Sequence, residues 1–184
     1  MIKMKKAIII SIMLILGISS MFSGCIQSGS GTLLLQITDA PSDLNISKAL
    51  VNISIVQVHR ADFGSDDNDS DNNESDAGWF TIVNETQTFD LIQLIDVKEV
   101  FDEEELTAGW YTQIRLIVES ALVTIDDIEY DLHIPSKNVK LISPFEIVEN
   151  ETTVLTLDFD VFESIHKTGS DNYIMNPTIK VIHE

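Results

Sequence analysis

Carboxylates recur at short intervals in "GSDDNDSDNNESDAGW", residues 64 to 79. Asp67, Asp69 and Asp71 have the spacing of the first three oxygen ligands of an EF-hand calcium loop. The rest of that motif is absent, because Asn72 stands where glycine is needed and Gly78 where a bidentate glutamate is needed. Such a polar stretch buries too little apolar area to order itself. We therefore expect residues 64–77 to form an acidic, disordered connection, with weak calcium binding as the alternative.

A second carboxylate pair, Asp158 and Asp160, lies in the strand-like run "VLTLDFDVF". Residues i and i+2 of a strand share one face about 6.6 Å apart, which is close to the separation that glycosidases use. A glycosidase also needs one carboxyl group in a less solvated environment than the other, and no apolar residue in this row predicts such a difference. We expect a solvated sheet face or a contact with the loop that carries Asp39; catalysis by these outward aspartates is the alternative.

No other catalytic or metal-binding pattern stands out. The four histidines, His59, His133, His166 and His183, lack the spacing of a zinc site. The G-x-S-x-G nucleophile motif and phosphate-binding glycine loops are also missing. Asp39, in "TDAP", is expected to bond nearby backbone N–H groups at a turn. We predict no catalytic residue, no cofactor and no metal ligand.

The N-terminus has the features of an export signal. Three lysines among the first six residues precede an apolar run from residue 7 to 16, and Ser23 and Gly24 precede Cys25. Cys25 is the only cysteine, so it cannot form an intramolecular disulfide. "MFSGC" resembles a prokaryotic lipoprotein box, although Phe22 replaces the usual aliphatic residue. This resemblance implies cleavage before Cys25 and attachment of a glycerolipid to its thiol; an uncleaved signal anchor is the alternative.

The remaining chain is strongly acidic. Thirty acids face eleven lysines and arginines, and removal of the three lysines of residues 1–24 leaves eight and a formal charge of −22. Such a surface repels phosphate backbones, which argues against nucleic-acid binding. It also repels anionic lipid head groups. We therefore expect the lipid on Cys25, rather than the protein surface, to contact the membrane.

Asparagine sequons support an exterior location. Six of the ten asparagines begin an N-x-S/T triplet, which is more than about one or two expected by chance and is typical of a glycosylated surface. A chain that is merely rich in Asn, Ser and Thr is the alternative. The candidate N-glycosylation sites are Asn45, Asn52, Asn68, Asn73, Asn84 and Asn150.

Short β-branched runs separated by turn residues dominate residues 32–184. We predict strands at 31–38, 48–60, 78–83, 111–125, 128–134, 138–142, 144–148, 152–162 and 173–182. This number of strands favours an all-β fold with two packed antiparallel sheets, either immunoglobulin-like or transthyretin-like, and a short helical connection around residues 91–105. We thus divide the chain into a signal (1–24), a flexible tether (25–31) and a single sandwich domain (32–184).

Three local features sharpen this prediction. The parity of buried positions changes between Ile55 and Val56, which indicates a β-bulge. "TIDDIEY" predicts a tight hairpin around Asp126 and Asp127. In "ELTAGWY", the spacing of Leu106, Gly109 and Tyr111 favours a tyrosine corner, in which the hydroxyl group bonds to an earlier backbone group.

The order of several motifs resembles a known prokaryotic family, domain of unknown function 4382. The motifs are "TDAP" (38–41), "VQVHR" (56–60), "GW" (78–79), "FDLIQL" (89–94), "LTAGWYTQIRLIV" (106–118), "SPFEI" (143–147), "LDFDVFESIHKTG" (157–169) and "YIMNPTIKV" (173–181). The resemblance implies an exported, lipid-anchored β-sandwich and transfers no active site.

Two functions of different classes follow from these observations. The first, which we favour, is a non-enzymatic module on the outer face of the cell membrane, held by the lipid on Cys25, that binds a glycan, a surface protein or the cell envelope. The second is an extracellular hydrolase of carbohydrate or peptide that uses the outward aspartates. A soluble form that turns over no substrate would favour the first.

Overall fold

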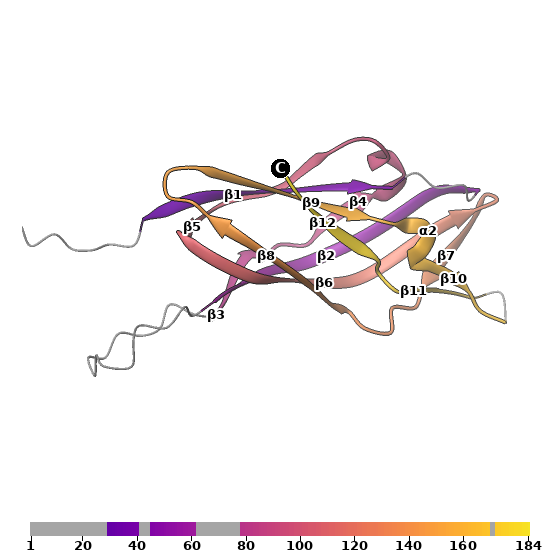
Figure 1. Ribbon diagram of the computed structural model, residues 1–184. Coiled ribbons are helices and arrows are strands. Elements are labelled where there is room, and N and C mark those ends of the chain that lie inside the picture. Colours follow the sequence, from indigo (N-terminus) through magenta and orange to yellow (C-terminus); the bar gives the residue numbers. More distant parts are fainter. Residues whose placement is uncertain (1–28, 41–44, 62–77, 170–171) are drawn as a thin grey trace, which may run out of the picture.

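The computed structural model describes residues 29–184 apart from 41–44, 62–77 and 170–171. It is an all-β sandwich in which two sheets face each other along an elongated body (Figure 1). The export signal, Cys25 and the acidic connection lie outside the described residues, so the predictions for them are untested. An immunoglobulin-like or transthyretin-like topology also stays a prediction.

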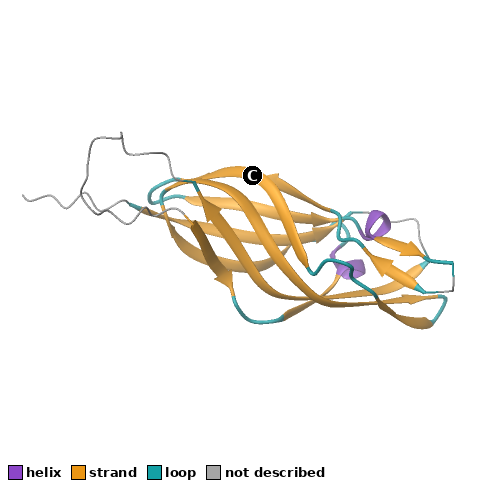
Figure 2. Ribbon diagram, turned by 90° about the horizontal axis from the view of Figure 1, so that it is seen from below, coloured by secondary structure: helices purple, strands orange, loops and turns teal. Residues whose placement is uncertain are grey.

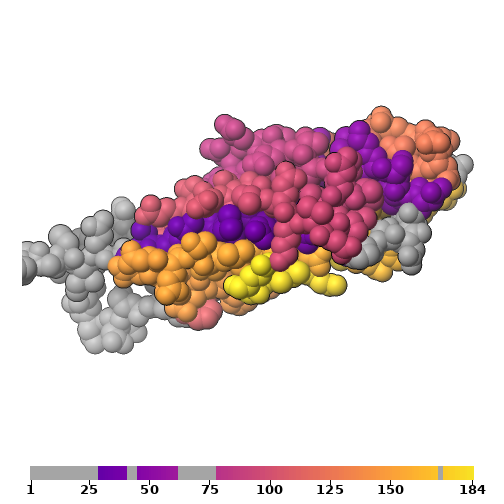
Figure 3. Space-filling view, turned by 90° about the horizontal axis from the view of Figure 1, so that it is seen from above, coloured from indigo at the N-terminus to yellow at the C-terminus, as the bar shows by residue number. Residues whose placement is uncertain are grey.

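The first sheet, sheet A, contains four strands. In spatial order they are β12 (Ile179–His183), β9 (Thr152–Phe159), β1 (Ser30–Asp39) and β5 (Glu99–Thr107). β1 runs antiparallel to β5 but parallel to β9, which differs from the purely antiparallel arrangement predicted. Figure 3 shows β1, in indigo, between the pink β5 region and the orange and yellow C-terminal strands. β1 also begins at Ser30, inside the predicted tether.

The second sheet, sheet B, contains six strands, all paired antiparallel. They are β2 (Ile46–Arg60), β3 (Gly78–Val83), β4 (Gln87–Asp90), β6 (Gly109–Ile125), β7 (Ile128–Leu132) and β8 (Asn138–Ile147). The long strands β2 and β6 form its centre, β3 and β4 follow one another along β2, and β7 and β8 lie along β6. In Figure 2 the molecule is turned so that this sheet is toward the viewer.

The remaining elements are short and lie at one end of the sandwich. They are the 3-10 helix η1 (Leu91–Leu94), the helix α2 (Val161–Ser164), and the paired strands β10 (Ile165–Lys167) and β11 (Tyr173–Met175). The predicted strands 152–162 and 173–182 are therefore each interrupted. In the first, Asp160 caps a helix; in the second, residues 176–178 separate β11 from β12.

The predicted helical connection around 91–105 is correct only for η1. From Glu99 onward the chain forms β5, an edge strand of sheet A. Phe101 and Leu106 point into the core, whereas Glu103, Glu104 and Glu105 are exposed. Backbone pairing with β1 thus overrides the helical spacing of the apolar residues. The exposed glutamates also discourage this edge strand from pairing with other chains.

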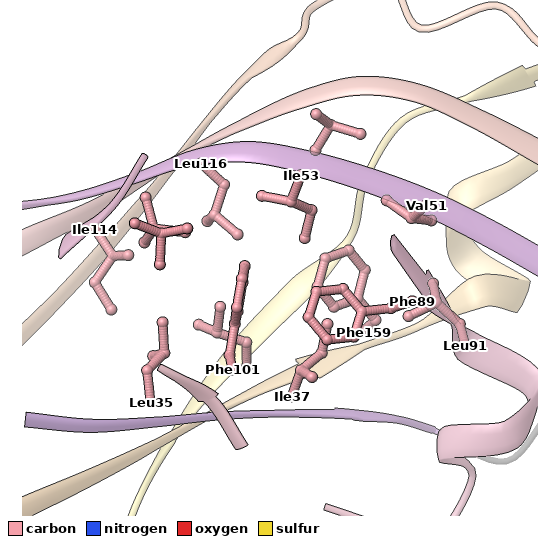
Figure 4. Close-up of a cluster of buried hydrophobic side chains, with 14 of the residues drawn as sticks. Leu35, Ile37, Val51, Ile53, Phe89, Leu91, Phe101, Ile114, Leu116 and Phe159 are labelled. Carbon is pink, nitrogen blue, oxygen red and sulfur yellow. The ribbon is translucent and has the colours of Figure 1, made fainter. Parts of the chain in front are cut away.

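The core fills the space between the sheets (Figure 4). Leu35 and Ile37 of β1 face Ile53 of β2 and Leu116 of β6, and all four side chains are at most 1% exposed. Phe89 and Phe101 add an edge-to-face contact with ring centroids 4.8 Å apart. Because such burial contributes about 25 cal/mol per Å² of apolar surface, this interlocked layer is the main source of stability.

The three local predictions are confirmed. The β2–β6 register shifts between Ile53 and Ile55, which accounts for the change of parity. Asp126 and Asp127 form the β6–β7 turn with φ values of 49° and 63°, as a tight hairpin requires. The hydroxyl group of the fully buried Tyr111 donates a hydrogen bond to the Thr107 carbonyl oxygen at 3.0 Å. Gly109, between them, has a φ of 139°.

Candidate functional site

Three aspartates meet where β1 and β9 end, and we call Asp39, Asp158 and Asp160 the aspartate cluster. β1 and β9 run parallel, with Thr38 beside Asp158 and Asp39 beside Phe159. The parallel register therefore brings both strand ends to the same edge, and Asp160 follows directly. This is the contact with the Asp39 loop that the sequence predicted.

Asp160 has a structural role within the cluster. Its Oδ1 accepts a hydrogen bond from the Glu163 backbone N–H at 2.9 Å, and it thereby caps the N-terminus of α2. Asp160 consequently lies outside β9. The predicted pair of outward aspartates on one strand face is wrong for this residue, because the strand ends at Phe159.

Asp39 is the most buried member of the cluster, with 2% of its surface exposed. Its Oδ1 accepts a hydrogen bond from the Val161 backbone N–H at 3.1 Å, whereas its Oδ2 is buried without a partner among the described residues. Desolvation raises the pKa of the Asp39 carboxyl to about 7; the Val161 N–H opposes this rise, and the negative charges of Asp160 and Asp158 add to it. Asp39 thus exchanges its proton near neutral pH.

Asp158 is half-buried rather than fully exposed on a wet face. Desolvation raises its pKa, the neighbouring Lys180 lowers it, and Asp160 raises it. Its neighbour in the same row, Thr156, is also buried, and its hydroxyl group lies within hydrogen-bond distance of the side-chain oxygens of Gln36 and Glu184, at 3.2 and 2.7 Å. The prediction that this row faces solvent is therefore wrong, because neighbouring side chains cover it.

Ser164, which was not among the predicted site residues, joins the cluster to the C-terminal strands. This buried residue donates through Oγ to the Asp160 carbonyl oxygen at 2.5 Å and accepts from the Thr178 backbone N–H at 2.9 Å. Its carbonyl oxygen accepts from the Asn176 N–H at 2.8 Å. A single serine between the predicted strands 152–162 and 173–182 gave no signal for this role, which depends on α2.

Chemically, the cluster has the unequal carboxyl environments that acid–base catalysis uses, since Asp39 is desolvated and Asp158 is half-exposed. Catalysis also requires that the proton donor reach the substrate. Asp39 presents almost no surface, and its one bonded oxygen orients the start of α2. In this conformation the aspartate cluster can hold a proton, and its hydrogen bonds position the start of α2. Asp39 itself is too deeply buried to contact a ligand.

A cavity of about 250 Å³ opens at the same end of the sandwich. Its lining residues are Asn45, Ile46, Ile125, Ile165, Lys167 and Tyr173. Tyr173 also packs against Tyr130, with ring centroids 4.8 Å apart. Because sites for drug-sized molecules usually exceed about 300 Å³, this cavity suits a side chain or one small group of a larger ligand.

The four histidines, which all belong to the described residues, do not form a common site. His59 contacts Thr112 through Nδ1 at 3.1 Å, and His183 contacts Ser143 through Nε2 at 2.8 Å. His133 and His166 are exposed. Within the described part of the chain, no group of three or more His, Cys, Asp or Glu side chains is arranged to hold a metal ion.

Four of the six sequon asparagines are described. Asn45, Asn84 and Asn150 are exposed. The Asn52 amide instead donates to Ser120 Oγ at 2.8 Å, and its oxygen accepts from Thr88 at 2.5 Å. Glycosylation of Asn52 would disrupt this bridge between strands, and glycosylation of Asn45 would disrupt the hydrogen bond that its Nδ2 donates to Asp126 Oδ1. Asn84 and Asn150 are therefore the better candidates.

Among the described residues, none belongs to a helix with the length and apolar character needed to cross a membrane.

Comparison with known proteins identifies one family. Residues 30–177 match the family model described as "Domain of unknown function (DUF4382)". No curated protein and no solved structure matches the chain.

Proposed function

The chain belongs to the DUF4382 family, and from this premise we propose that it is a cell-surface binding or adhesion module, held on the outer face of the membrane by a lipid on Cys25. The family description assigns no activity, so the proposal depends on the chain's own residues. It is a non-enzymatic role with a glycan, a surface protein or the cell envelope as ligand.

The direction of β1 is the observation that carries this proposal. β1 begins at Ser30, five residues after Cys25, and ends at Asp39. Five residues span at most about 18 Å, so a lipid on Cys25 would hold the Ser30 end of the sandwich near the membrane. The ten residues of β1 would extend about 33 Å away from it. This arrangement would present the aspartate cluster and the cavity at the outer end.

Stable anchoring by this route requires processing of the signal. A single acyl chain gives only marginal membrane binding, so the lipid that processing adds to Cys25 would need two chains to hold the protein stably. The acidic surface of residues 25–184 supports the same view, since it would contribute repulsion rather than attraction at an anionic membrane. The exposed sequon asparagines Asn45, Asn84 and Asn150 are compatible with an exterior location.

Cell fractionation of a Cys25→Ser variant tests the anchor. We expect the wild-type protein and a neighbouring control, Gln27→Ala, in the membrane fraction, and the Cys25→Ser protein outside it. Mass spectrometry of the wild-type protein should show a lipid on an N-terminal cysteine. A Cys25→Ser protein that stays in the membrane at full length would refute the lipoprotein proposal.

The hydrolase is the second candidate. The unequal environments of Asp39 and Asp158 favour it, but it requires a movement that exposes Asp39, which is 2% exposed in this structure. The test is turnover of a panel of glycans and peptides by the purified full chain. A binding module should bind members of the panel and cleave none. Turnover that disappears in both Asp158→Asn and Asp39→Asn would overturn the non-enzymatic proposal.

A further inference from the structure

The outer face of sheet B carries two rows of polar and aromatic side chains near the Ser30 end. Their alternation with buried residues sets their direction: Gln57 lies between the buried Val56 and Val58, and Arg115 lies between the buried Ile114 and Leu116. Cross-strand register aligns Gln57, Arg115 and Lys140 in one row, and Trp79, His59 and Gln113 in the next. We call these six residues the sheet B platform.

Arg115 and Lys140 are direct cross-strand partners on this platform. Like charges directly opposite each other destabilise a sheet. The pair is unexpected in a chain in which acids outnumber bases by 30 to 11. Among the described residues, neither cation forms an ion pair; the nearby Lys137 pairs with Glu119 at 3.0 Å instead. The pair therefore leaves two positive charges available on one face.

Arg115 is held in place by an aromatic side chain. Its guanidinium carbon lies 3.8 Å from the centroid of the Trp79 ring, and His59 contacts the same ring edge-on at 5.0 Å between centroids. The Nε atom of Arg115 and the Oε1 atom of Gln113 are both buried without a hydrogen-bond partner in the described structure. A guanidinium fixed by stacking loses little freedom when it binds a carboxylate.

The chemistry around these cations favours a sugar over a protein partner. Gln57 donates through Nε2 to Thr81 Oγ1 at 3.0 Å, and His59 contacts Thr112 through Nδ1. The groups that remain to bond hydroxyl groups are Gln57 Oε1, His59 Nε2 and the Gln113 amide nitrogen. Arg115 covers one face of Trp79, so the platform lacks the exposed aromatic and apolar centre that protein interfaces use. Ile142, beside Gln113, is the exposed apolar residue at its border, with 79% of its surface exposed.

We propose that the sheet B platform binds a short oligosaccharide that carries a carboxylate, with Arg115 and Lys140 on the carboxylate and the amides on neighbouring hydroxyl groups. This inference rests on the proposed binding function and names a ligand class for a second surface, which lies nearer the Ser30 end than the aspartate cluster and the cavity do. The strong negative charge of the protein favours a short ligand, because a short ligand brings few negative charges close to the other acids. At physiological salt the Debye length is about 8 Å, so more distant acids would repel it only weakly.

Calorimetric titration of the detergent-solubilised full chain provides the test, with trigalacturonate as the probe. Its methyl-esterified form is the control ligand, because it keeps the sugar and loses the charge. We expect trigalacturonate to bind at least about tenfold more tightly than the ester, since hydrogen bonds to charged groups are stronger than neutral ones. Equal binding of the two ligands would overturn the proposal.

Two variants test the residues, with one matched control. Arg115→Gln and Lys140→Gln should each weaken trigalacturonate binding about tenfold, as loss of one charge-assisted contact predicts. Lys48→Gln makes the same change of charge on β2, nine residues or about 30 Å from Gln57, and should leave binding unchanged. Because Lys140 is exposed, its replacement should not affect folding. Wild-type affinity in both platform variants would contradict the assignment.

Two further outcomes separate this inference from the proposed function. Tighter binding of a polyglutamate peptide than of trigalacturonate would overturn the sugar in favour of an acidic protein partner. Binding of another surface ligand that is unaffected by Arg115→Gln and Lys140→Gln would refute the platform and keep the binding module. Failure of Cys25→Ser to release the protein would refute the anchor and leave the platform intact.

Discussion

The two ends of the sandwich bury polar side chains in opposite ways. At the Ser30 end, the Tyr111 hydroxyl group is neutral and bonds to the Thr107 carbonyl oxygen, and its ring stacks on Phe145 at 5.3 Å between centroids. At the Asp39 end, the buried side chain is ionisable and one of its oxygens has no partner in the described structure. Burial of a bonded neutral group stabilises a fold, whereas burial of a charge opposes it. The buried polar group at the Ser30 end thus stabilises the fold, whereas the one at the Asp39 end makes the free energy of unfolding depend on pH.

Truncation of the tyrosine should have the largest effect. Tyr111→Ala removes a fully buried ring and its hydrogen bond, and we expect it to lower the free energy of unfolding by about 3 to 5 kcal/mol. Tyr111→Phe keeps the ring and should cost about 1 kcal/mol. Urea denaturation measures both. Equal losses of unfolding free energy in the two variants would show that the hydroxyl group, rather than the ring, stabilises the tyrosine corner.

Neutralisation of Asp39 should change the pH dependence of stability. Its pKa rises from 3.8 to about 7 on folding, so the folded state binds more protons between these values and stability falls as pH rises from about 4 to about 7. Asp39→Asn removes this loss while its amide oxygen can still accept the Val161 N–H. We expect the variant to be more stable than wild type at pH 8 by roughly 2 to 4 kcal/mol, at about 1.4 kcal/mol per pH unit.

Denaturation of Asp39→Asn at pH 4 and pH 8 checks this sign. The variant and the wild type should converge at pH 4, where the folded wild type is already protonated. Asp131→Asn, an exposed acid on β7, should change stability by no more than about 0.5 kcal/mol. If the Asp39→Asn protein were less stable at pH 8, the charged Asp39 would be a stabilising group and the contrast between the ends would fail.

Close packing at the Ser30 end gives the smallest of the three effects. A Cβ atom at Gly31 would lie 2.1 Å from the Val148 carbonyl oxygen and 3.0 Å from that of Glu151. Gly31→Ala must therefore displace backbone, and we expect a loss of about 1 to 3 kcal/mol. Gly169→Ala is the matched control, because nothing lies within 4 Å of its Cβ position. Similar melting temperatures for the two variants would contradict tight packing here.

Much of the fold was predictable because strands, turns and bulges leave local patterns. The alternation of Leu155, Leu157 and Phe159 set the buried face of β9, and the pair Asp126–Asp127 marked a hairpin. β5 was missed because its pairing partner, β1, lies about seventy residues earlier in the chain. An acidic run such as residues 103–105 becomes a strand only when another edge offers backbone hydrogen bonds.

The functional surfaces depended more on tertiary structure. The sequence could place Asp39 at a strand end and Asp158 on a strand, but the parallel pairing of β1 and β9 brought them together and desolvated Asp39. The sheet B platform was also invisible in the sequence, since its six residues come from four strands and align only through cross-strand register.

The sequence by itself determined the all-β class, the tyrosine corner and the family resemblance, because each depends on residue types at short spacing along the chain. Tertiary structure alone decided which side chains became neighbours across the sheets, and therefore which charges were buried or left exposed. The reason is physical: alternation needs only adjacent residues, whereas desolvation and electrostatic interaction depend on distances in space that strand register sets.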